Sequence, residues 1–131
     1  MGIDLKPLSE KIPSHVRVYQ GDILSMDNEL FKLTGKGFNV VLSDMAPATT
    51  GHRDVDAARS LNLCEAALRI VRAHLKPGGH FVCKIFQGPD VQGFTDRVRD
   101  DFTHQRIYKP QSSRKASREI FVIGKGKKQE D

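Results

Sequence analysis

Three carboxylates in this 131-residue sequence stand where predicted strands give way to loops: Asp4, Asp22 and Asp44. In an open α/β sheet, ligands bind beyond the carboxyl ends of the strands, and an acid there commonly accepts hydrogen bonds from a ribose. A single aspartate at such a position is more often a turn or cap residue. Three of them in successive units favour a ligand that contains a nucleoside.

Lys84 lies within an apolar stretch, between Cys83 and Ile85. An unpaired ammonium is costly to bury, so a lysine in a central strand needs an acidic partner, whereas one in an edge strand can point into solvent. Desolvation is expected to lower the pKa of a buried lysine toward a value that suits proton transfer. Since Asp44 and Glu119 also fall at predicted strand ends, the three side chains are a candidate proton-transfer group.

The positive charge of the chain is confined to its C-terminal part. The net charge is +5. Residues 1–102 contain 13 basic and 13 acidic side chains, whereas residues 103–131 contain eight basic and three acidic side chains. A local basic excess is typical of a surface that binds a polyanion, although a solvated basic tail is about as common. Donors suited to phosphate groups precede Glu119, namely Ser112, Ser113, Arg114, Lys115, Ser117 and Arg118.

The elements that must position these groups alternate between short strands and longer helices. We predict strands at residues 2–5, 16–20, 38–43, 80–86, 104–109 and 119–124. We predict helices at residues 24–34, at residues 56–75 and from residue 90 onward. This alternation predicts an α/β fold with a mostly parallel sheet, helices on both faces and a C-terminal antiparallel hairpin.

Composition excludes several classes of protein. No apolar run approaches the roughly 20 residues of a transmembrane helix, and the N-terminus lacks the apolar core of a signal peptide. The five histidines and two cysteines show no metal-ligand spacing, so no metal is expected. Cys64 and Cys83 lie in apolar segments and are expected to be reduced thiols, which favours a cytoplasmic protein without membrane contact.

Four segments carry a family resemblance: Ser43 to Pro47, Lys76 to Gly79, Lys84 to Gly88, and Ser112 to Glu119. Together they resemble the FtsJ-like (RrmJ-type) ribosomal RNA 2′-O-ribose methyltransferases, over residues 2 to about 128. The resemblance implies a Rossmann-like methyltransferase fold and S-adenosyl-L-methionine as the cofactor. It also implies methylation of large-subunit ribosomal RNA, with free RNA and the large ribosomal subunit both open as the substrate.

The resemblance further implies roles for individual residues. Three of them match the second, third and fourth members of a catalytic Lys-Asp-Lys-Glu tetrad: Asp44, Lys84 and Glu119. In that tetrad Lys84 activates the ribose 2′-hydroxyl and the two acids hold it. The implied cofactor site comprises Asp4 for the ribose, Asp22 for the adenine, Leu5 and Ile23 beside the ring, and Asp44 and Met45. The RNA-binding residues are Ser112, Ser113, Arg114, Lys115 and Arg118.

The family's first strand, its glycine-rich cofactor loop and its first lysine would all precede Asp4. We therefore expect residues 1–131 to be a single, N-terminally truncated methyltransferase domain that lacks the first, central strand. That strand would lie between those that end at Asp4 and Asp44. Three explanations for the missing strand are open: the chain is truncated, the two neighbouring strands pair directly, or another chain supplies a strand. We expect weak or absent cofactor binding and self-association through the exposed sheet edge.

Two other functions are open. A non-catalytic RNA-binding module derived from this fold would keep the basic residues and lack turnover. A different enzyme of the same fold with a nucleoside cofactor would differ in its substrate. No motif identifies the target nucleotide, because base contacts are not encoded in any pattern of this sequence.

Overall fold

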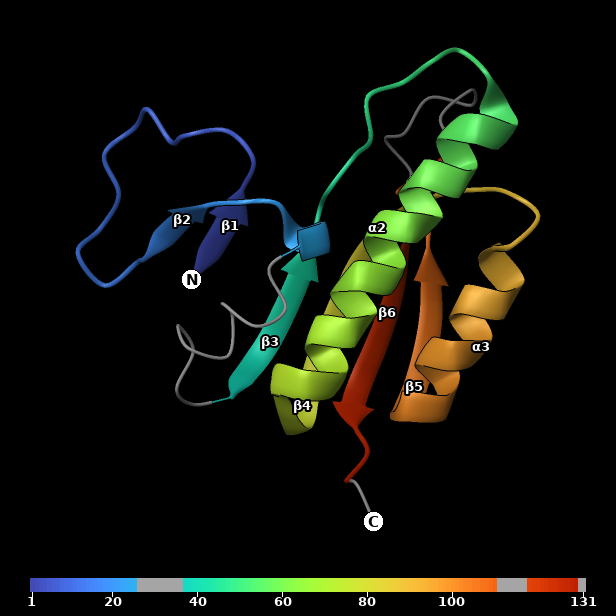
Figure 1. Cartoon of the computed structure of the whole chain (residues 1–131). Coiled ribbons are helices and arrows are strands. Elements are labelled where there is room, and N and C mark those ends of the chain that lie inside the picture. Colours follow the sequence, from blue (N-terminus) through green and yellow to red (C-terminus); the bar gives the residue numbers. More distant parts are fainter. Residues whose placement is uncertain (26–36, 111–117, 130–131) are drawn as a thin grey trace. The chain divides into compact units, whose positions relative to one another are not determined.

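The computed structural model describes residues 1–25, 37–110 and 118–129 (Figure 1). The chain divides into two compact units, Met1–Gly35 and Lys36–Asp131, so the single domain stays a prediction. In the first unit, two short parallel strands precede a 3₁₀ helix: β1 (Gly2–Asp4), β2 (Val18–Gln20) and η1 (Ile23–Ser25). Most of the helix predicted at residues 24–34 lies outside the described residues.

The second unit is built on a four-stranded sheet with the order β3-β4-β6-β5. Its strands are β3 (Phe38–Ser43), β4 (Leu75–Phe86), β5 (Phe102–Tyr108) and β6 (Glu119–Lys127). β3 and β4 are parallel, whereas β6 is antiparallel to both of its neighbours. The α/β class and the C-terminal hairpin are confirmed. The sheet is mixed rather than mostly parallel, because β6 returns between β4 and β5.

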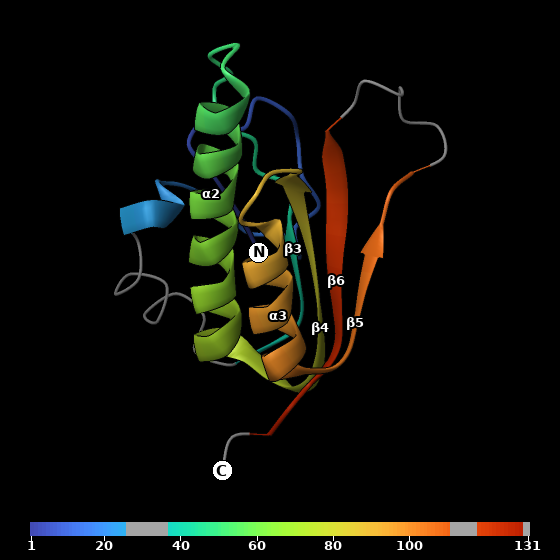
Figure 2. The ribbon, with the colours of Figure 1, turned by 90° about the vertical axis from the view of Figure 1, so that its right-hand side faces the viewer.

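Both α-helices of the described chain, α2 (Arg53–His74) and α3 (Val91–Asp101), cover the same face of this sheet (Figure 2). Burial alternates along β4, as the period of a strand requires. The core between helices and sheet includes Leu68, Val71, Phe81, Ile85, Phe94, Val98 and Val122. Helices on both faces were expected, and the described residues place helices on one. None of the described helices combines the length and apolar composition needed to cross a membrane.

β4 begins at Leu75, earlier than the predicted strand at residues 80–86. Phe38 pairs with Leu75 and Val40 pairs with His80, so β4 bulges against β3. Gly78 has a φ of +83°, which glycine adopts at little steric cost. Residues 76–79 lie between the predicted helix at residues 56–75 and the predicted strand at residues 80–86, and the structure places them in β4. Beyond the bulge the two strands stay paired as far as Ser43 and Cys83, where β3 ends, and β4 continues to Phe86.

Candidate active site

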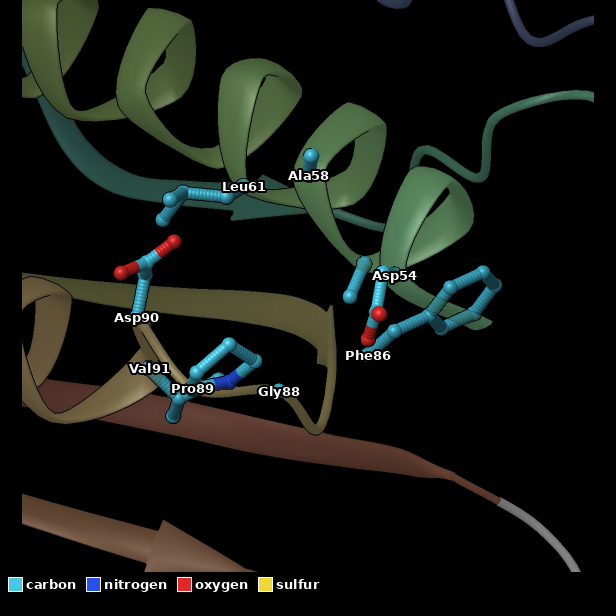
Figure 3. Close-up of a pocket in the computed structure, with 9 residues that line it drawn as sticks. Asp54, Ala58, Leu61, Phe86, Gly88, Pro89, Asp90 and Val91 are labelled. Carbon is cyan, nitrogen blue, oxygen red and sulfur yellow. The ribbon is translucent and has the colours of Figure 1, made fainter. Parts of the chain in front are cut away.

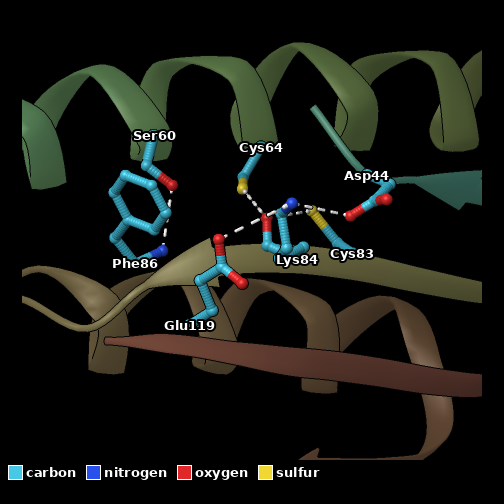
Figure 4. Close-up of polar contacts among 7 residues, drawn as sticks. All are labelled: Asp44, Ser60, Cys64, Cys83, Lys84, Phe86 and Glu119. Carbon is cyan, nitrogen blue, oxygen red and sulfur yellow. Dashed lines mark hydrogen bonds and ion pairs between the residues drawn. The ribbon is translucent and has the colours of Figure 1, made fainter. Parts of the chain in front are cut away.

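Lys84 lies between two carboxylates near the carboxyl ends of β3 and β4 (Figure 4). Its Nζ is 2.8 Å from Asp44 Oδ1 and 3.8 Å from Glu119 Oε1. Ser43, the last residue of β3, pairs with Cys83, so Asp44 leaves β3 beside Lys84. Glu119 begins β6 opposite the end of β4. The structure therefore brings together the three residues that the sequence predicts to act together.

The pKa of Lys84 is raised above its ordinary value. The largest cause is its hydrogen bond to Asp44. Burial lowers the pKa, and this hydrogen bond together with the negative charges of Asp44 and Glu119 outweighs burial. The expectation of a lowered pKa is wrong for Lys84: burial acts in that direction, but the two acidic neighbours reverse the net effect. Lys84 is therefore an ammonium at neutral pH.

Two side chains of α2 hold the backbone of β4, one at Lys84 and one at Phe86 (Figure 4). Cys64 Sγ donates to the carbonyl oxygen of Lys84 at 3.1 Å, and Ser60 Oγ accepts from Phe86 N at 2.9 Å. Ser60 and Cys64 are one helical turn apart, share a face of α2 and are each 1% exposed. Their hydrogen bonds hold the backbone of β4 where this strand extends beyond the end of β3. Sequence reasoning missed this role, although a serine on the buried face of a helix is a usable signal.

The loop that follows Asp44 is tied to α2 by the buried Asp56. Its Oδ1 accepts from Thr50 N at 2.8 Å and from Thr50 Oγ1 at 2.9 Å. The hydrogen bond from the Thr50 backbone is the largest cause that holds the pKa of Asp56 below its ordinary value. Asp56 thus anchors the segment between Asp44 and α2.

In the first unit, the two acids predicted to bind a nucleoside lie at the same edge of the β1–β2 pair. Because the strands are parallel, Asp4 and Asp22 both come at or after a carboxyl end. Asp4 Oδ1 accepts from Lys6 N at 3.0 Å, and Asp22 Oδ1 accepts from Leu24 N at 3.0 Å. Both carboxylates and the neighbouring Leu5 are exposed. Oriented carboxylates beside an apolar side chain suit the hydroxyls of a ribose and the amine of an adenine.

The other predicted site residues lie in varied settings. Ile23 begins η1 and is half-buried. Met45 packs against the core of the second unit. Arg118 directs its guanidinium at the carbonyl oxygens of Arg53 and Gln87. The remaining predicted RNA ligands lie outside the described residues: Ser112, Ser113, Arg114 and Lys115.

A small hollow opens between the start of α2 and the loop that joins β4 to α3 (Figure 3). It is lined by Asp54, Ala57, Ala58, Leu61, Phe86, Gly88, Pro89, Asp90 and Val91. A Cβ on Gly88 would lie 2.8 Å from Ala57 Cβ, so glycine allows this close approach of the loop to α2. The hollow borders the end of β4, and its lining does not include Lys84, Asp44 or Glu119.

The fold of the chain is that of solved methyltransferases. A structure described as a ribosomal RNA methyltransferase from Plasmodium falciparum has a TM-score of 0.81 at 25% identity and covers 95% of this chain and 70% of that chain. Human methyltransferase-like protein 13 in complex with SAH has a TM-score of 0.52 at 16% identity and covers 83% and 48%, respectively. The second likeness shows the fold alone. The expected Rossmann-like methyltransferase fold is confirmed.

The chain belongs to the FtsJ-like methyltransferase family, whose family model matches residues 1–127. Ribosomal RNA large subunit methyltransferase E of Desulforapulum autotrophicum is 51% identical over 98% of this chain and 63% of that protein. The protein of the same name from Desulfatibacillum aliphaticivorans is 48% identical over 98% of this chain and 62% of that protein. The chain therefore spans just under two thirds of the length of these relatives.

Proposed function

We propose that these residues belong to an S-adenosyl-L-methionine-dependent methyltransferase that acts on a ribose 2′-hydroxyl of large-subunit ribosomal RNA. The observation that carries the proposal is the ammonium of Lys84 between the carboxylates of Asp44 and Glu119. Membership of the family and the names of the relatives support the type of reaction. When bound, S-adenosyl-L-methionine supplies an electrophilic methyl group.

Lys84 acts on the attacking hydroxyl as a cation and not as a neutral base. Its raised pKa keeps it protonated, so Nζ can donate a hydrogen bond to the 2′-oxygen and stabilise the negative charge that develops there. Asp44 and Glu119 hold the ammonium in place. The side chain of Asp44 is 80% exposed, so its carboxylate can accept the hydroxyl proton and release it to water.

The first unit supplies the proposed contacts to the nucleoside part of the cofactor. Asp4 accepts hydrogen bonds from the ribose hydroxyls, and Asp22 accepts one from the adenine amine. Leu5 and Ile23 lie beside the adenine ring. The orientation of both carboxylates by backbone N–H groups supports these roles, because it sets their oxygens in place before a ligand binds. The assignment of Asp44 and Met45 to cofactor binding stays a prediction from the sequence.

The proposed partner is ribosomal RNA, either free or within the large subunit. Support comes from the basic excess of residues 103–131, which suits a phosphate backbone. Ser112, Ser113, Arg114 and Lys115 stay predicted phosphate ligands. The cytoplasm is the proposed compartment, and the free thiols of Cys64 and Cys83 agree with it.

The test is transfer of a labelled methyl group to unmethylated large ribosomal subunits, with the longest natural form of the protein. We expect Lys84→Met to reduce transfer by about 100-fold or more, because it removes the cation at the reacting oxygen. Lys76→Met is the matched control, since Lys76 is an exposed lysine of the same strand, and should keep full activity. Activity retained in Lys84→Met would overturn the proposal. RNA binding without any transfer by the wild type would favour the non-catalytic module.

A further inference from the structure

Arg118 joins three segments that surround the candidate site. Its Nη2 donates to the carbonyl oxygen of Gln87 at 2.9 Å, and both Nη1 and Nη2 lie 3.4 Å from the carbonyl oxygen of Arg53. The carbonyl oxygen of Arg118 also accepts from Gln87 N at 2.8 Å. One residue thus links the start of α2, the segment after β4 and the start of β6.

Two of these segments adjoin charged residues of the site, namely Lys84 in β4 and Glu119 at the start of β6. Glu119 directly follows Arg118 and pairs with Phe86 at the end of β4. The bonds between Arg118 and Gln87 extend this antiparallel pairing by one residue on each strand. They therefore help to hold the start of β6 in the position at which Glu119 lies 3.8 Å from the Nζ of Lys84.

We propose that Arg118 is a positioning residue for the ion pair between Lys84 and Glu119, and not a phosphate ligand. The inference deepens the proposed function and rests on it, since the position of Glu119 matters to the reaction only if Lys84 acts there. Arg118 is half-buried, and both terminal nitrogens of its planar guanidinium face carbonyl oxygens of the protein. A lysine ammonium lacks this fork and cannot reproduce the geometry.

Two substitutions at position 118 separate positioning from phosphate binding. Arg118→Lys keeps the positive charge and loses the fork, whereas Arg118→Met loses both. Arg106→Met is the matched control, because Arg106 is an exposed arginine of the same β5–β6 hairpin. The first measurement is the titration of Lys84 by NMR in protein labelled at lysine Cε. The second is the Kd for a ribosomal RNA fragment as a function of salt concentration.

We expect Arg118→Lys and Arg118→Met both to lower the pKa of Lys84, because Glu119 is released, and Arg106→Met to leave it unchanged. The Kd of Arg118→Met for RNA should stay within about two-fold of the wild type, although this variant loses the positive charge. A phosphate ligand gives the opposite pattern. Arg118→Met would then weaken RNA binding and reduce the salt slope by about one, with the Lys84 titration unmoved.

An unchanged Lys84 titration in both variants at position 118 would overturn the positioning role. Global unfolding of both variants would overturn it as well, because Arg118 would then be needed for the fold as a whole. The titration requires no methyl transfer, so the two proposals fail separately. A lowered pKa of Lys84 in the variants, with no methyl transfer by the wild type, would refute the proposed reaction and support the effect of Arg118 on the ion pair.

Discussion

The Nζ of Lys84 lies 2.8 Å from Asp44 Oδ1, although the lysine side chain is only 14% exposed and that of the aspartate is 80% exposed. The largely buried ammonium of Lys84 thus forms an ion pair with the solvent-exposed carboxylate of Asp44 at the edge of the sheet. Water screens such a pair, so its contribution to stability is small. Its larger effect is to keep a charged ammonium at one defined place.

The first prediction compares the two acids that hold Lys84. Asp44→Asn should lower the pKa of Lys84 more than Glu119→Gln does, because the hydrogen bond to Asp44 is the largest cause of the raised value. Asp44→Asn should change the free energy of unfolding by less than about 1 kcal/mol, since the pair is mostly exposed on the acid side. NMR titration of Lys84 and urea unfolding measure the two quantities. A larger effect of Glu119→Gln on the lysine would contradict the assignment.

The second prediction concerns stability at alkaline pH. Because the pKa of Lys84 is raised in the folded chain, its stabilising contribution is fully present below the ordinary lysine value of about 10.4. The contribution is lost as the pH rises through the folded value. The free energy of unfolding of the wild type should therefore fall more steeply above about pH 10 than that of Lys84→Met. The measurement is urea unfolding across this pH range, with Lys76→Met as the control. If the free energies of unfolding of the wild type, Lys84→Met and Lys76→Met fell in parallel, the prediction would be wrong.

Much of this site could be predicted from the order of residues. Apolar runs that end at Ser43 and Phe86 predict strands, and parallel strands bring Asp44 and Lys84 to one edge. The direction of the Lys84 pKa could not be predicted, because it depends on two interatomic distances that no spacing encodes. The early start of β4 was also missed, since Pro77 and the glycines after it usually signal a turn outside a strand.

The third prediction tests how α2 supports β4. Ser60→Ala removes the acceptor of the Phe86 N–H and should cost about 1–2 kcal/mol in the free energy of unfolding. Asn62→Ala, at an exposed position of the same helix, should stay within about 0.5 kcal/mol of the wild type. Amide hydrogen exchange at Phe86 should speed up only in the first variant. Equal stabilities of the two variants would show that this bond does not support the strand.

The fourth prediction concerns the edge of the four-stranded sheet. β3 is its terminal strand and carries two exposed apolar side chains, Val40 at 49% and Leu42 at 72%. We expect the chain to self-associate through this strand, because an apolar edge is a template for further pairing. Leu42→Lys should shift sedimentation toward the monomer, whereas Leu8→Lys, an exposed leucine of the first unit, should not. A wild type that stays monomeric at high concentration would refute this.

The fifth prediction concerns Asp56 and stability in acid. Its pKa is held below the ordinary value, chiefly by the backbone N–H of Thr50, so its contribution is present above the unfolded value of about 3.9. The contribution is lost as the pH falls through the folded value. Urea midpoints measured from neutral pH downward should therefore decline more in the wild type than in Asp56→Asn, and Asp54→Asn, an exposed acid of the same turn, should follow the wild type. Parallel declines in the wild type and Asp56→Asn would mean that Asp56 does not anchor the loop after Asp44.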